Sequence, residues 1–151
     1  MWQRGWGEAM ADLVRASGIA VRAADALLRT AGGRTVVLRL PAPAIPADAA
    51  EQLGLAVPEF QDVELGPVVV QSVKAGAGGA AGTRELLVSA TAVNRIVGSL
   101  AYAAAHVLFS VAYGVLLDGV LLEVISVTEQ EIGGQPYVYR VTVRVPLALA
   151  V

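Results

Sequence analysis

Residues Val115-Leu-Leu-Asp-Gly-Val-Leu-Leu-Glu-Val-Ile-Ser-Val127 carry the most specific structural signal in this chain. Its Asp118-Gly119 pair lies between two apolar runs, which is the strongest short-range signal for a tight β-hairpin, because glycine adopts positive φ without strain. Gly133-Gly134 marks a second turn, and in the following run, 137–145, apolar and polar residues alternate. The range 115–146 is therefore predicted to form a C-terminal β-meander with one face buried.

The composition is that of an unusually apolar chain of one-domain size. Its 151 residues suffice for a single core, so 1–151 is predicted to be one domain. Hydrophobic residues make up 56% of the chain and the mean hydropathy is +0.62, as in chains that bury surface against partners or lipid. With 11 basic and 13 acidic residues the net charge is -2, which argues against a groove that neutralises nucleic-acid phosphates.

An N-terminal helix is predicted within 1–32, with its regular part beginning at Glu8. Apolar residues recur there at spacings of three and four, which indicates one buried face, and Gly32-Gly33 follows as a C-terminal stop signal. Gly18 is expected to bend or split the helix. The predicted apolar face consists of Ala9, Leu13, Ala16, Ala20, Ala24, Leu27 and Leu28.

Further strands and two short helices are predicted before the meander. Gly66-Pro67 is expected to separate two strands, and Thr91 is the expected N-cap of a short helix that Gly98 stops. A second, more buried helix is expected over 99–113. The strands are expected at 34–40, 60–65, 68–73 and 84–90. Together these elements predict an α+β, mostly β fold: a small antiparallel β-barrel or sandwich with an N-terminal helix and one or two short helices before the C-terminal meander.

One segment between predicted strands has no large side chain. Lys74-Ala-Gly-Ala-Gly-Gly-Ala-Ala-Gly-Thr83 contains four glycines in ten residues, so 74–83 is predicted to be a flexible Gly/Ala arm or a long hairpin tip. Its glycine spacing resembles a phosphate-binding loop only superficially. The segment runs into a strand rather than a helix, and it lacks the Gly-Lys-Ser/Thr of a P-loop.

The sequence shows no constellation for catalysis or metal binding. His106, the only histidine, lies among alanine and valine without a neighbouring carboxylate, which favours a core or interface histidine over a catalytic base. The acidic residues Glu59, Asp62 and Glu64 match no calcium loop. Since cysteine is absent, disulfides and thiolate metal sites are excluded. We therefore expect no enzyme activity, metal or cofactor, and a ligand-binding β-barrel stays open as an alternative.

A membrane span is a second alternative. Residues 97–117 carry no formal charge and approach the length of a spanning helix. The segment is rich in alanine, contains His106, ends inside the predicted hairpin and lacks a flanking Lys/Arg cluster. A buried helix followed by a strand explains it more simply.

The order of elements resembles that of the small head-tail joining or head-closure (connector) proteins of tailed bacteriophages. A strand running into a short helix (85–96) precedes an apolar strand, Asp118-Gly119 and the run 120–127. In that family such an order completes a small β-barrel, and the outline matches best from residue 85 onward. The resemblance implies a structural virion protein that forms a homo-oligomeric ring between the portal side of the capsid and the tail, with DNA only passing through the lumen.

The same resemblance implies partners and a location. Portal or adaptor and tail proteins would be the partners, with no membrane, in the virion and in the host cytoplasm during assembly. The segments with freedom to order on a partner are the N-terminal tryptophans and the Gly/Ala arm. The candidate interaction residues are Trp2, Trp6, Lys74, Gly76, Gly78, Gly79, Gly82 and Arg84.

Overall fold

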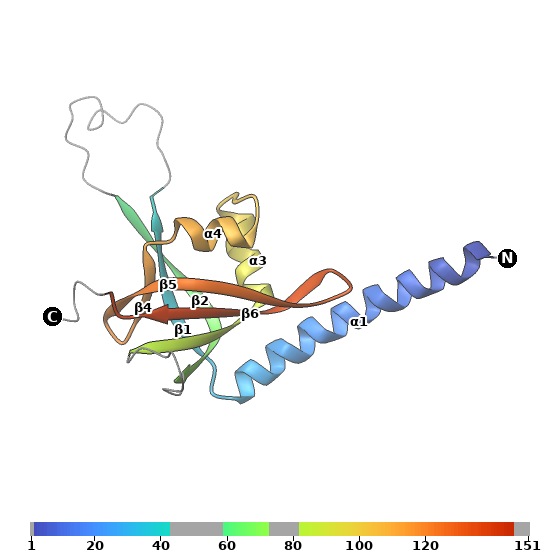
Figure 1. Cartoon of the computed structure of the whole chain (residues 1–151), viewed down its shortest axis with the longest axis horizontal. Helices are drawn as coiled ribbons and strands as arrows, with labels where there is room; N and C mark the ends of the chain where they lie inside the picture. The colour runs from blue at the N-terminus through green and yellow to red at the C-terminus, as the bar shows by residue number, and fades with distance from the viewer. Residues whose placement is uncertain (1, 43–58, 73–81, 147–151) are drawn as a thin grey trace, which may run out of the picture.

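The structure, a computed structural model, describes residues 2–42, 59–72 and 82–146. As predicted, it is mostly β, with an N-terminal helix and two short helices before the C-terminal strands (Figure 1). The elements follow in the order α1 (Trp2–Thr30), β1 (Arg34–Pro41), β2 (Phe60–Ser72), β3 (Thr83–Ser89), α3 (Ala90–Ser99), α4 (Ala105–Val111), β4 (Gly114–Leu117), β5 (Val120–Ile132) and β6 (Gln135–Arg144).

The six strands close into an antiparallel barrel, which decides between the two predicted architectures. Their order around the barrel is β1-β2-β3-β6-β5-β4, and β1 closes it by pairing with β4. The β4–β5 pairing is short, since it ends at Val115 and Leu122. Beyond Leu122, β5 pairs only with β6 among the described residues, so its other edge is open from there to Ile132.

The predicted meander is confirmed. Asp118 and Gly119 form the β4–β5 turn with φ angles of 51° and 81°, as a tight hairpin requires. In β6, Tyr139, Val141 and Val143 are buried, whereas Arg140 is exposed and Thr142 is half-buried, so the strand alternates as the sequence predicts.

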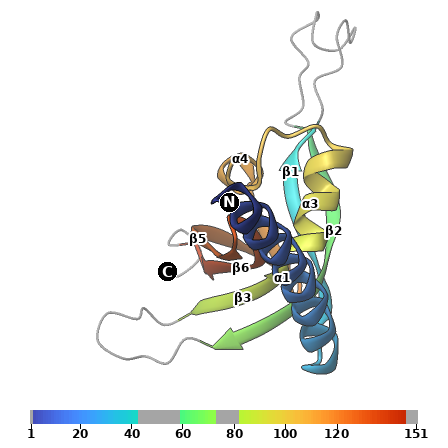
Figure 2. The same ribbon diagram turned by 90° about the vertical axis from the view of Figure 1, so that its right-hand side faces the viewer.

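Buried aliphatic side chains from every strand fill the barrel. Helix α3 packs against β2, β3 and β6, and α4 lies beside α3 and over β5 (Figures 1 and 2). Phe109 of α4 contacts the core next to Tyr139, with 6.1 Å between the ring centroids. The largest fully buried side chains are Leu38, Leu40, Leu65, Leu86, Leu108, Val68, Val88, Val93, Val115, Val141 and Val143.

The predicted break at Gly66-Pro67 is wrong, because β2 runs through both residues as one strand of 13 residues. The register with β1 shifts at this point, from Arg34 opposite Val68 to Val36 opposite Leu65. A bulge of this kind gives proline a place within a strand, where it breaks no regular ladder hydrogen bond.

The helix boundaries also differ from those predicted. The helix α1 begins at Trp2 and continues unbroken through Gly18, because one glycine costs only about 1 kcal/mol in a helix. The N-cap of α3 is Ser89 rather than Thr91: the Ser89 hydroxyl accepts a hydrogen bond from the Ala92 N–H, and the helix passes Gly98 to Ser99.

The apolar segment 97–117 is not one helix. It comprises the end of α3, a turn, the seven-residue α4 and the strand β4, so the buried helix predicted over 99–113 is replaced by a shorter one. Among the described helices, none combines the length and hydropathy that a membrane crossing needs.

Candidate assembly interface

The C-terminal half of α1 packs on the barrel. Ser17, Ala24 and Leu28 are buried there against the sheet and α3, so Ala24 and Leu28 of the predicted apolar face are confirmed. Leu27 of that face is exposed, because the buried face of the helix is centred on Ala24 and Leu28 and turns Leu27 toward solvent. Asp25 fixes the contact: its carboxylate accepts hydrogen bonds from the hydroxyls of Ser89 and Thr91.

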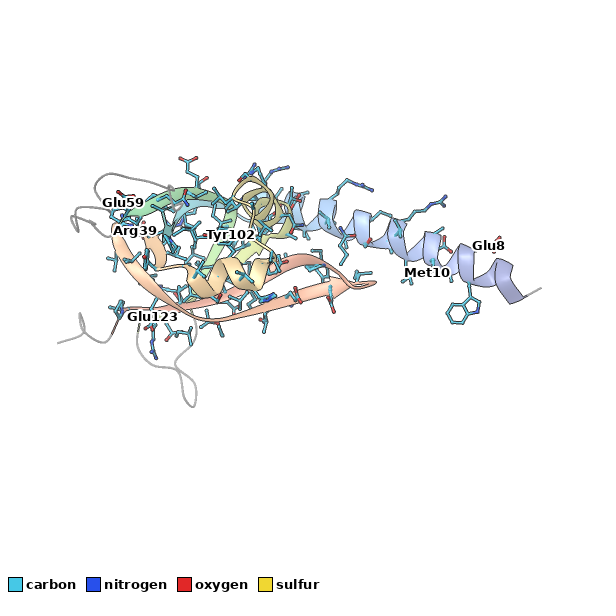
Figure 3. The ribbon with its side chains drawn as sticks, turned by 90° about the horizontal axis from the view of Figure 1, so that it is seen from above. Glu8, Met10, Arg39, Glu59, Tyr102 and Glu123 are labelled. Carbon is cyan, nitrogen blue, oxygen red and sulfur yellow. The ribbon has the colours of Figure 1, made fainter. Side chains whose placement is uncertain are left out.

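The N-terminal half of α1 projects away from the barrel (Figures 1 and 3). Every residue from Gly5 to Ala16 is exposed within the described part of the chain. Four large apolar side chains are among them, and we call them the α1 stripe: Trp6, Met10, Leu13 and Val14, with exposed fractions of 73, 59, 45 and 68%. Met10 and Glu8 point to opposite sides of the helix in Figure 3.

The α1 stripe lies on the same helix face as the buried residues further along. At 3.6 residues per turn, Trp6, Met10 and Leu13 align with Ser17, Ala24 and Leu28. The face that holds α1 to its own barrel therefore continues along the projecting half, where Leu13 lies beside Gly133 of the β5–β6 turn and the other members of the α1 stripe are more exposed. Glu8, Asp12 and Arg15 occupy the opposite side, as on the solvated face of an amphipathic helix.

A groove lies between α4 and β5, and we call it the α4–β5 groove. One cavity of about 560 Å³ is lined by Phe109, Ala112 and Tyr113 from the helix side and by Glu123 to Val127 from the strand. A neighbouring cavity of about 340 Å³ shares His106 and Val127 with it and reaches Tyr139. The open edge of β5 borders the groove. Val111, Tyr113 and Ile125 add exposed apolar surface around it.

His106 lines both cavities and is exposed, so the structure does not place it in the core. Tyr139 forms the inner wall of the second cavity. Burial raises the pKa of its hydroxyl, and the negative charges of Glu129 and Glu131 raise this pKa further. The groove thus combines apolar residues such as Phe109 and Val127 with polar ones, among them His106, Ser126 and Glu123.

An ion pair with Arg39 accounts for Asp62, one of the three acidic residues between Glu59 and Glu64. The Arg39 guanidinium donates two hydrogen bonds to Asp62, at 2.8 and 2.9 Å, and lies 3.9 Å from the Phe60 ring centroid. The hydrogen bond from Arg39 lowers the pKa of the Asp62 carboxyl, and this effect outweighs desolvation. Among the described residues, no three acidic or histidine side chains gather as a metal site.

The structure places three of the sequence-predicted interaction residues by their surroundings. Trp6 belongs to the α1 stripe and does not pack on the domain's own surface. Gly82 has a φ of 89° at the start of β3, and Arg84 donates a hydrogen bond of 2.7 Å to the Ser72 hydroxyl. The start of β3 lies on the side of the barrel away from the projecting half of α1, so these residues do not form one site with Trp6 (Figure 1).

The remaining candidate residues lie wholly or in part outside the described structure. Trp2 begins α1, and its side chain is outside the described part of the structure. The residues Lys74, Gly76, Gly78 and Gly79 lie outside the described residues, as does most of the 74–83 arm.

Sequence reasoning missed Met10 and Val14, although their signal was present. If the helix starts before Glu8, Trp6, Met10 and Leu13 follow one another at spacings of four and three residues, so Met10 belongs to the same apolar face. Comparison of the chain with family models, curated proteins and solved structures finds no significant match.

Proposed function

We propose that this protein is a structural subunit that assembles with copies of itself into a ring. The observation that carries the proposal is the α1 stripe, an apolar helix face that projects from a closed barrel and whose four large side chains are 45 to 73% exposed. The stripe continues the helix face that already packs on the barrel. An exposed apolar patch of this kind marks a contact surface, because large apolar side chains are unfavourable in water.

The size of the stripe supports a protein contact. Its four side chains expose an apolar area on the order of 500 Å², near the upper end for single patches on monomeric proteins. A standard interface buries about 800 Å² per partner, so the stripe supplies more than half of one side. The apolar composition, with 56% hydrophobic residues, is consistent with this use.

The proposed place of the ring is the head-tail interface of a tailed bacteriophage, where it joins the portal side of the capsid to the tail and surrounds the DNA channel. The resemblance in element order supports this assignment, and the closed β-barrel agrees with it. The net charge of -2 suits a chain that lets DNA pass rather than gripping its phosphates. Portal or adaptor and tail proteins are then the partners, and the ring performs no catalysis.

Electron microscopy of tailed particles tests this proposal. Particles are produced in cells that express the chain with an epitope tag, and gold-labelled antibody locates the tag. We expect label between head and tail in intact particles. Particles that carry no label, or carry it over the capsid shell or along the tail, would rule out the head-tail assignment.

A further inference from the structure

We infer that the α1 stripe of one copy docks in the α4–β5 groove of the next copy. The inference rests on the proposed ring assembly and names the two surfaces that join neighbouring subunits. Two different surfaces meet in such a contact, so each copy offers one stripe and one groove, and repetition of the contact closes a ring when the rotation between copies divides a full turn.

The stripe has the form of a groove-binding helix. Its side chains stand at positions i, i+4, i+7 and i+8, which is the anchor spacing of amphipathic helices that bind in grooves. Trp6 leads this set with 73% of its surface exposed, and tryptophan is among the residues that dominate interface energetics. The opposite face carries Glu8, Asp12 and Arg15, which stay in solvent in this arrangement.

The groove provides a matching surface. Phe109, Ala112 and Val127 supply an apolar lining, and the cavity of about 560 Å³ is large enough for side chains to enter. A buried indole also needs an acceptor for its N–H. The edge of β5 beyond Leu122 pairs with no described strand, so backbone carbonyl groups are available there.

The contact must join two copies, because the α1 stripe does not reach the α4–β5 groove of its own barrel. The helix packs on β6, β3, β2, β5 and α3, and Asp25 ties it to Ser89 at the start of α3. On the way out it passes the β5–β6 turn, where Gly133 lies next to Leu13. The N-terminal part of α1, which carries Met10, then extends beyond the barrel (Figures 1 and 3).

Cysteine cross-linking tests the inference directly, since the chain has no cysteine of its own. Two single variants, Met10→Cys and Ile125→Cys, are purified, mixed in equal amounts and treated with a short thiol cross-linker. Both positions are exposed, so neither change removes core packing. The matched control replaces Met10→Cys by Asp12→Cys, two residues along on the other side of the helix. We expect at least tenfold more heterodimer from the Met10 and Ile125 pair than from the control.

Three results would overturn the inference. Equal cross-linking of the two pairs would show that the groove does not select the stripe. Cross-links only between two Met10→Cys chains would show that the helices pair with each other instead. A lack of any product at concentrations where light scattering detects oligomers would place the contact elsewhere. The cross-linking experiment uses only the purified chain. Antibody label between head and tail without this cross-link would refute docking in the α4–β5 groove. The cross-link without label between head and tail would refute the phage assignment.

Discussion

The Asp25 carboxylate accepts hydrogen bonds from two hydroxyls at the start of α3, those of Ser89 and Thr91. Ser89 is at the same time the N-cap of α3, so one carboxylate joins the long helix to the cap of a short one. A negative charge is favourable at this position because the helix dipole is positive at the N-terminus. This junction fastens the C-terminal half of α1 to the start of α3.

Replacing Asp25 by alanine is expected to destabilise the fold. Ser89 is 1% exposed, so its hydroxyl would lose its acceptor without gaining water, at a cost of about 1–3 kcal/mol. Equilibrium urea unfolding measures this loss. Asp12→Ala, on the exposed face of the same helix, is the control and should stay within about 0.5 kcal/mol of the wild type. Equal effects of the two changes would mean that the junction contributes nothing.

Glycine substitutions at the two ends of β4 test the meander. Gly119→Ala places a methyl group at a φ of 81° and should cost about 1–2 kcal/mol. Gly114→Ala should cost more, because its methyl group would overlap the Leu122 carbonyl oxygen. Gly7→Ala meets no neighbour on the exposed helix and should stabilise by about 0.5–1 kcal/mol. Thermal unfolding ranks the three, and any other order would contradict the described geometry of the meander.

The Arg39–Asp62 pair predicts a loss of stability in acid. The folded state lowers the pKa of Asp62 below 3.8, so the pair stabilises the fold above that pH and the contribution is lost as the pH falls through the lowered pKa. Asp62→Asn removes this titration. We expect the urea midpoint of the variant to fall less between neutral and strongly acidic pH than that of the wild type. Parallel pH profiles would show that the pair is too well solvated to matter.

The meander was predictable because its signals are local. Asp118-Gly119 specifies a tight turn, and the alternation of Tyr139, Val141 and Val143 assigns the buried face of β6 without knowledge of the rest of the fold. The barrel was predictable only as one of two architectures, since its closure depends on β1 pairing with β4, more than 70 residues later in the sequence.

Other features depend on contacts that sequence patterns do not show. The strand β2 continues through Pro67 because its register with β1 shifts at this residue. Ser89 rather than Thr91 caps α3 because the helix begins at Ala90, directly after Ser89 ends the strand β3 in an extended conformation. The candidate site was predicted in part: Trp6 was identified, whereas the α4–β5 groove arises from elements that meet only in the folded barrel.

The molar mass in solution shows whether the α1 stripe joins copies of this chain. Light scattering of the wild type should give a multiple of 15.5 kDa. Trp6→Ala should weaken this assembly at least tenfold, because Trp6 leads the α1 stripe and is 73% exposed, whereas Ile19→Ala should not, because Ile19, which is 59% exposed, lies on the opposite side of the same helix. A wild-type mass of 15.5 kDa at every concentration, or equal weakening by the two changes, would contradict the claim.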